Sequence, residues 1–387
     1  MLHHALPFGL LLVSMGLLAC SSTAKPAVVY ASSGKVLRVY DLDAARGELT
    51  LKQTLPELEN DVHYVAVHPS RKYLYVSCSE IPPPKDRPFV NAIHAFAIDG
   101  KTGTLASLGP TYASPLSRAI HVSVDRSGHY LLMAHNFAES ASVLRLNDDG
   151  SLGSPVQQPE ERQHLGFLAH QIRVDPSNRW AFVPVRGNET SLGHMAIFDF
   201  RDGVLQKRTL LDYPSGLGPR HLDFHPTKPW VYVAMENGNR LITYEHHEGV
   251  LTQRFDTTTL ANPDAASPGQ GAAAIHVHPS GQWVYVSNRD TTPADPGENS
   301  VAVFAIDAAT GEPKLVQSID SHGISPRTMT LDPSGHVLIV ANQSKGPGGI
   351  EPNLSVFRIG ADGKLTYVRT YPQSSGDTWW IGAVSLP

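Results

Sequence analysis

Short runs in which apolar and polar residues alternate recur along the chain, and turn residues separate them. In the clearest cases a strand pattern ends at Val277-His278-Pro279-Ser280-Gly281 or Leu331-Asp332-Pro333-Ser334-Gly335, and a second strand pattern follows. Alternation with a period of two predicts β-strands, and clustered Pro, Ser and Gly predict tight turns. No segment shows a competing helical period, so the pattern indicates an all-β protein.

Two kinds of strand pair alternate along the chain. The first pair, joined by a proline-type turn, occurs six times, with turns at positions 69, 126, 176, 226, 279 and 333 that are spaced by 57, 50, 50, 53 and 54 residues. The second pair occurs seven times, beginning near Val36, Asn91, Ser142, Met195, Leu241, Ser300 and Leu354. Four strands in roughly 50 residues is the repeat of a β-propeller blade.

The unequal numbers of the two pairs have a simple explanation. A propeller must close, because an open ring exposes a sheet edge. The C-terminal segment 379–384 is a hydrophobic strand with no second half, so we expect it to complete the blade begun by residues 28–52. The prediction is one seven-bladed β-propeller domain over residues 28–387, with four antiparallel strands per blade. A pair of β-sandwiches is the alternative.

The N-terminus has the pattern of an export signal. The apolar run Phe8–Ala19 is too short to span a bilayer but fits the central region of a secretory signal, although no Lys or Arg precedes it. Leu17-Leu18-Ala19-Cys20 resembles a bacterial lipobox, in which Cys20 becomes lipidated; cleavage after 22–24 is the alternative. We expect residues 1–24 to be a signal and short tether, and the mature protein to be periplasmic or held to the membrane only by that lipid.

Composition narrows the function classes. The chain has 31 Lys and Arg against 36 Asp and Glu, a net charge of −5, and no basic run, so a nucleic-acid partner is not expected. Only two cysteines exist, Cys20 and Cys78. We therefore expect no structural disulfide, and a buried strand position for Cys78.

Polar residues recur at two fixed positions of the blade repeat. The first column lies six residues before each turn position and consists of His63, Ile120, His170, Arg220, Ala273 and Arg327. The second column lies ten residues after each turn position and consists of Ser79, Asn136, Arg186, Glu236, Arg289 and Gln343. In an antiparallel pair these two columns lie at the same end of the blade. His121 and His221 directly follow the first column, so a cationic ring around one mouth of the central channel is predicted.

A ring of Arg and His suits an anionic ligand. Arg recognises carboxylate or phosphate with two hydrogen bonds, and His can act as a general base. Glu236 is either a base or an arginine partner. Any single histidine can instead tie strands together, which is the interpretation for the turn residues His68, His225 and His278. The neighbouring arginines disfavour a metal held by ring histidines and Glu236, and we expect no cofactor.

The stretch Gly218-Pro219-Arg220-His221-Leu222-Asp223-Phe224-His225-Pro226 resembles the propeller lactonase family, and Ser325-Pro326-Arg327 and Ser287-Asn288-Arg289 match it too. That family includes bacterial 6-phosphogluconolactonases and fungal 3-carboxy-cis,cis-muconate lactonizing enzymes. The resemblance implies a metal-free hydrolase of a sugar lactone. It implies channel residues at His121, Arg220, His221, Arg289 and Arg327, with Glu236. Two features depart from the family: no proline precedes His121 in 117–121, and export does not fit a cytoplasmic phosphogluconolactone.

The residue roles follow from the expected reaction. His221 or His121 is expected to activate water, Arg220 or Arg289 to stabilise the oxyanion, and Arg327 to hold the acidic or hydroxylated end of the lactone. The further substrate contacts expected are His63, His170, Arg289 and Gln343. A non-catalytic binding propeller, with insertions 81–87 and 291–298 as partner loops, and a muconate-type lactonizing enzyme are the alternatives. The oligomeric state is left open.

Overall fold

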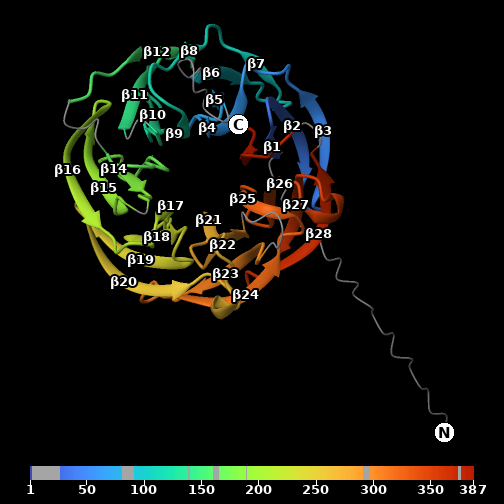
Figure 1. The fold of residues 1–387 in the computed structure, drawn as a ribbon. Helices are drawn as coiled ribbons and strands as arrows, with labels where there is room; N and C mark the ends of the chain where they lie inside the picture. Colours follow the sequence, from blue (N-terminus) through green and yellow to red (C-terminus); the bar gives the residue numbers. More distant parts are fainter. Residues whose placement is uncertain are drawn as a thin grey trace.

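The computed structural model describes Met1 and residues 27–80, 91–137, 140–159, 165–188, 190–290, 297–373 and 376–387. These residues form seven antiparallel sheets arranged as blades around a central axis (Figure 1). The predicted seven-bladed propeller is therefore confirmed, and the β-sandwich alternative is wrong. The expected signal, Cys20, the insertion 81–87 and most of the insertion 291–298 lie outside the described residues.

Each blade runs from an inner strand at the axis to an outer strand at the circumference. Blade 1 consists of β29 (Ile381–Ser385), β1 (Ala27–Ser33), β2 (Val36–Asp43) and β3 (Glu48–Thr54). Blade 2 consists of β4 (Asp61–Val67), β5 (Tyr73–Ser79), β6 (Asn91–Ile98) and β7 (Leu105–Ser107), and the short β8 (Tyr112–Ala113) also pairs with β6. Blade 3 consists of β9 (Ala119–Val124), β10 (Tyr130–His135), β11 (Ser140–Leu146) and β12 (Leu152–Pro155).

The remaining four blades follow the same order. Blade 4 consists of β13 (Arg173–Val174), β14 (Trp180–Val185), β15 (His194–Arg201) and β16 (Val204–Asp212). Blade 5 consists of β17 (Pro219–Phe224), β18 (Trp230–Met235), β19 (Arg240–His247) and β20 (Val250–Thr258). Blade 6 consists of β21 (Gln270–Val277), β22 (Trp283–Asp290), β23 (Ser300–Ile306) and β24 (Pro313–Asp320). Blade 7 consists of β25 (Ile324–Leu331), β26 (Val337–Ser344), β27 (Asn353–Ile359) and β28 (Leu365–Pro372).

Helix is nearly absent from the part of the chain that the structure describes. It is limited there to two 3₁₀ turns, Pro263–Ala265 and Pro347–Gly349. None of the described helical segments has the length and apolar character needed to cross a membrane.

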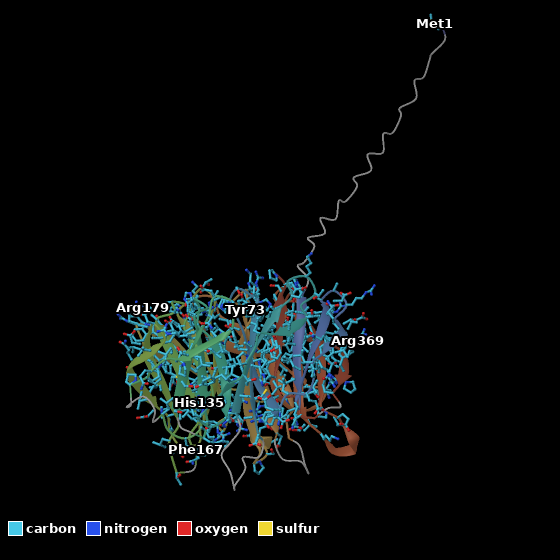
Figure 2. All side chains as sticks on the ribbon, turned by 90° about the horizontal axis from the view of Figure 1, so that it is seen from above. Met1, Tyr73, His135, Phe167, Arg179 and Arg369 are labelled. Atoms are coloured by element: carbon cyan, nitrogen blue, oxygen red, sulfur yellow. The ribbon has the colours of Figure 1, made fainter. Side chains whose placement is uncertain are left out.

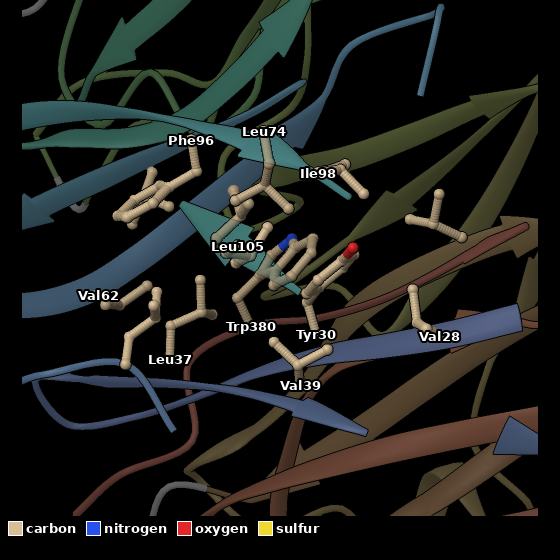
Figure 3. Close-up of a cluster of buried hydrophobic side chains, with 14 of the residues drawn as sticks. Val28, Tyr30, Leu37, Val39, Val62, Leu74, Phe96, Ile98, Leu105 and Trp380 are labelled. Carbon is tan, nitrogen blue, oxygen red and sulfur yellow. The ribbon is translucent and has the colours of Figure 1, made fainter. Parts of the chain in front are cut away.

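The C-terminal strand closes the ring. β29 is the inner strand of blade 1 and pairs antiparallel with β1, with Val28 opposite Val384 and Tyr30 opposite Gly382. Just before β29, Trp380 packs into the core between blades 1 and 2, beside Tyr30, Leu37 and Leu105 (Figure 3). The two ends of the propeller chain thus meet in one sheet, as the repeat count predicts.

Hydrophobic cores fill the spaces between adjacent blades. Each core combines alternate residues of one sheet with the facing residues of the next, as expected when both faces of a strand are covered. Cys78 lies in the core between blades 1 and 2 and is completely buried, as expected from its strand position.

The propeller has two distinct ends (Figure 2). At one end, marked by His135 and Phe167 in Figure 2, the inner strands begin and the second strands finish; we call it the rim end. At the other, marked by Tyr73 and Arg179, lie the proline-type turns that join these two strands; we call it the turn end. These two ends are the mouths of the central channel.

Candidate functional site

Strand register brings the two polar columns together at the rim end. Asp61 lies opposite Ser79, Pro219 opposite Met235, and the amide of Glu236 donates to the carbonyl of Gly218 over 2.7 Å. The start of each inner strand and the end of its partner are therefore neighbours, as the spacing of the repeats predicts.

The inner strands share a feature that the sequence did not reveal. Most of the inner strands are bulged near the first column, and the unpaired residue is His63 in β4, Ile120 in β9, Arg220 in β17 and Arg327 in β25. A bulge inserts an extra residue and re-aims its side chain. The bulge thus gives four of the six first-column residues a position outside the regular strand pairing.

Glu236 is the centre of a cluster of arginines. Its carboxylate lies 2.7 Å from the Arg289 guanidinium, 3.1 Å from Arg186 and 3.3 Å from Arg220. Arg220 is almost completely buried and donates a further hydrogen bond to the carbonyl of Ala273 over 2.8 Å. One carboxylate from blade 5 therefore orients arginines from blades 4, 5 and 6.

The charge state of Glu236 follows from this cluster. Burial alone would raise the pKa of Glu236, but Arg289, Arg220 and Arg186 outweigh burial and hold that pKa below its ordinary value. A carboxylate stabilised by three arginines accepts a proton poorly. Of the two roles considered for Glu236, the arrangement favours that of arginine partner.

Two further arginines complete what we call the arginine rim: Arg118, Arg186, Arg220, Arg289 and Arg327. The Arg327 guanidinium lies 4.5 Å from the centre of the Trp379 ring, and Arg118 lies 4.9 Å from that of Phe137. Among the described residues, no carboxylate is within ion-pairing distance of Arg327 or Arg118. Burial lowers the pKa of Arg327, and repulsion from Arg289 and Arg220 lowers it further.

Two predicted histidines lie within this cationic cluster. Burial lowers the pKa of His170, and Arg220, Arg327, Arg186 and Arg289 lower it further. Burial, Arg118 and Arg327 likewise lower the pKa of His63, whose ring lies 5.0 Å from that of Trp379. Both histidines are therefore neutral at pH 7, the protonation state that a general base requires.

His121 and His221 lie deeper in the channel. Their ring centres are 5.8 Å apart, and the Tyr64 ring is 4.0 Å from His121 and 6.3 Å from His221. Both line a cavity of about 470 Å³ at the turn-end side of the channel, which does not include His170. The His221 ring lies beside that of His170, with the ring centres 5.2 Å apart. The structure thus divides the predicted residues between the arginine rim and a cavity behind it.

Gln343 belongs to the periphery of the rim. Its side-chain amide donates to the Asp377 carboxylate over 3.1 Å. Trp379, two residues after Asp377, lies against both Arg327 and His63. Sequence reasoning selected neither Trp379 nor Arg118 for the site, and it included Arg186 in a column without assigning it a role.

Comparison with known proteins points in one direction. The family model described as Lactonase, 7-bladed beta-propeller matches residues 19–381. A 6-phosphogluconolactonase of Bacillus subtilis is 29% identical, covering 84% of this chain and 88% of that protein. A 6-phosphogluconolactonase of Yersinia pestis is 28% identical, covering 92% of this chain and 97% of that protein. The structure of a periplasmic gluconolactonase from Pseudomonas aeruginosa matches the fold with a TM-score of 0.77 at 22% identity, covering 94% of this chain and 100% of that one.

Proposed function

Since the chain belongs to the lactonase family of seven-bladed β-propellers, we propose that it is a hydrolase that opens a sugar lactone at the arginine rim. The observation that carries this proposal is the cluster in which Glu236 pairs with Arg186, Arg220 and Arg289, while no carboxylate of the described residues forms an ion pair with Arg327 or Arg118. Such a cluster suits a substrate that carries or develops negative charge.

In the proposed reaction, water attacks the carbonyl carbon of the lactone. His170 takes a proton from that water, and the carbonyl oxygen becomes an oxyanion beside Arg289. The bond between the carbonyl carbon and the ring oxygen then breaks, and the ring oxygen leaves as a hydroxyl group after receiving the proton. The product is an open-chain hydroxy acid, which ionises to its carboxylate. A base of this kind contributes about 10²–10⁴-fold, and one oxyanion donor about 10²–10³-fold.

The base is assigned to His170 rather than to His221 or His121 because of their surroundings. Rim arginines act on both His170 and His221, but His221 and His121 line the cavity behind the rim, whereas His170 does not. Arg220 is already engaged by Glu236 and by a backbone carbonyl, so its proposed role is to position Glu236. Arg327, with no carboxylate partner in the described chain, is proposed to hold the acidic or hydroxylated end of the lactone.

The charge of the rim favours an anionic lactone. Of the five guanidinium groups of the rim, three pair with the carboxylate of Glu236, and Arg327 and Arg118 form no ion pair with a described residue. A phosphate or carboxylate on the substrate would pair with Arg327 and Arg118 in the bidentate manner that guanidinium allows. We therefore propose that the enzyme prefers a lactone with an anionic substituent over an uncharged one.

Purified protein and a pH-stat test this proposal, with spontaneous hydrolysis subtracted. We expect acid release from both glucono-1,5-lactone and its 6-phosphate, with the higher kcat/KM for the phosphorylated lactone. Hydrolysis of neither lactone would contradict the proposed activity and favour a binding propeller. A higher kcat/KM for the uncharged lactone would contradict the anionic preference alone.

Export and lipidation remain part of this proposal. The motif that ends at Cys20 supports a lipoprotein signal, and the Pseudomonas aeruginosa neighbour is described as periplasmic. Mass spectrometry of membrane and soluble fractions should find a mature chain that begins at Cys20 and carries lipid, and Cys20→Ser should abolish palmitate labelling. An intact Met1 in the cytosolic fraction would contradict export.

A further inference from the structure

The channel contains a cavity that the proposed reaction does not use. It has a volume of about 470 Å³, and the inner strands of all seven blades contribute to its walls at the turn-end side. This volume lies within the range of small-molecule sites. The neighbouring rings of Tyr64, His121 and His221 line it, and so does Trp380 from the closing segment of blade 1. On the rim side, the His221 ring lies 5.2 Å from that of His170, which does not line the cavity.

Polar groups with unused hydrogen-bonding capacity line this cavity. The Thr328 hydroxyl is buried without a hydrogen-bond partner among the described residues, and the residue as a whole is only 6% exposed. The side-chain oxygen of Gln171 accepts from the amide of Leu222, and no described residue accepts from its amide nitrogen. A buried hydroxyl without a partner costs free energy, so a site that keeps one is expected to satisfy it with a ligand or water.

The two deep histidines are suited to hydroxyl groups rather than to ions. Burial, helped by nearby arginines, holds the pKa of both His121 and His221 well below its ordinary value. Each ring is therefore neutral at pH 7, with one nitrogen that donates and one that accepts. His121 already accepts a long hydrogen bond of 3.4 Å from the amide of Ile172, whereas His221 makes none with the described residues.

The outer part of the cavity is positively charged. Arg126 and Arg173 both contribute to its walls, and no carboxylate of a described residue does. Arg173 is paired with Asp223 over 2.7 Å, and Asp223 also accepts from the amide of Val277 over 3.0 Å. Arg126 has no ion pair with a described residue, so one guanidinium at this mouth is available to an anion.

We propose that this cavity is a second binding site for a small polyhydroxylated anion of the aldonate class, separate from the arginine rim. The carboxylate pairs with Arg126 at the turn end, and the hydroxyl groups of the ligand bond with Thr328, Gln171 and His221. This assignment rests on the proposed function in one respect, because an aldonate is the class of product that opening a sugar lactone releases. The product would thus have a site at the far mouth of the same channel.

Calorimetric titration with D-gluconate tests the proposal in the Arg289→Ala variant, in which we expect the arginine rim to bind anions more weakly. We expect gluconate still to bind that protein, Arg126→Ala to weaken the binding at least about 10-fold, and Thr328→Val at least about 3-fold. Arg145→Ala, a change of another exposed arginine of blade 3 outside the cavity, is the matched control and should bind as its parent does. D-Sorbitol, the polyol without the carboxylate, should bind more weakly than gluconate.

The outcomes separate this proposal from the proposed function. The second site would be overturned if the Arg289→Ala protein did not bind gluconate. It would also be overturned if Arg126→Ala and Thr328→Val both left that binding unchanged, even if wild type hydrolyses lactones. Arg126-dependent binding by a protein that hydrolyses no lactone would uphold the site and overturn the function. In an active enzyme with wild-type Arg289, Arg126→Ala should keep lactone kcat/KM within about 2-fold of wild type.

Discussion

At the scale of single residues, Glu236 determines how the rim is arranged. It lies one strand away from Arg220 in the same blade and receives Arg186 and Arg289 from the blades on either side. The column arithmetic identifies these residues because strand pairing within a blade has a fixed register. It does not identify Trp379 or the cavity that His221 lines, since these depend on how seven blades pack around the axis.

Replacing Glu236 by Gln tests whether it is a base or an arginine partner. Removing the carboxylate leaves the buried guanidinium groups of Arg220 and Arg289, and the half-buried one of Arg186, without their counter-charge. We expect a loss of about 3–5 kcal/mol in the free energy of unfolding at pH 7. The pKa of Glu236 is lowered on folding, so its contribution is complete above pH 4.5 and declines as the pH falls below that value. Denaturant unfolding of both proteins at pH 7 and pH 4 measures the difference. Loss of activity with unchanged stability would support the base instead.

The pH dependence of the reaction reports on His170. Burial and the rim arginines lower its pKa below the ordinary value of 6.5, so the active neutral form persists into mildly acidic solution. We expect kcat/KM to stay level from pH 7.5 to about pH 6 and to fall only at more acidic pH. An acid limb centred at pH 6.5 or above would show that a normal histidine, or another group, limits the rate. His170→Gln should abolish the limb along with most of the activity.

At the scale of elements, repeated hydrogen bonds tie each blade to the next. Tyr30, Tyr75, Tyr232 and Tyr285 each donate from a second strand to the carbonyl of a glycine in the outer turn of the following blade, over 2.8–3.0 Å. His68, His225 and His278 bond in the same direction with the carbonyls of Gly128, Gly281 and Gly335 in the next proline-type turn. The turn histidines therefore act as structural links, in agreement with their interpretation from sequence.

Substitution of Tyr232 measures one such link. Its hydroxyl is buried and donates to Gly311 over 3.0 Å, so Tyr232→Phe should lower the free energy of unfolding by about 1 kcal/mol. Tyr73→Phe is a matched control, because the Tyr73 hydroxyl makes only an exposed contact of 3.4 Å. Urea unfolding of the three proteins gives the comparison. Equal stability of Tyr232→Phe and wild type would show that the hydroxyl contributes nothing to the contact between blades 5 and 6.

The repeats could be located from sequence because each blade has its own turn signal and strand alternation. The number of blades followed from six copies of one strand pair and seven of the other, and β29 supplies the missing strand. The bulges at His63, Arg220 and Arg327 could not be located, because the alternation of apolar residues continues across them. The bulges nevertheless take these residues out of the regular strand pairing.

At the scale of the whole molecule, the ring depends on its closing strand. Removing residues 379–387 deletes β29, exposes the edge of β1 and withdraws Trp380 from the core between blades 1 and 2. We expect the shortened protein to lose its cooperative unfolding transition and to aggregate, since an unpaired strand edge is exposed. Circular dichroism during heating checks this result. A normal melting curve for the shortened chain would contradict the closure.

The central claim is that the arginine rim carries out lactone hydrolysis, and the kcat/KM of Arg289→Ala for the preferred lactone tests it most directly. Glu236 keeps Arg186 and Arg220 in this variant, so the fold should persist. With Arg145→Ala as a control that retains wild-type kcat/KM, we predict that Arg289→Ala lowers kcat/KM about 10²-fold or more through kcat. A folded Arg289→Ala protein that hydrolyses the lactone as fast as wild type would contradict the account.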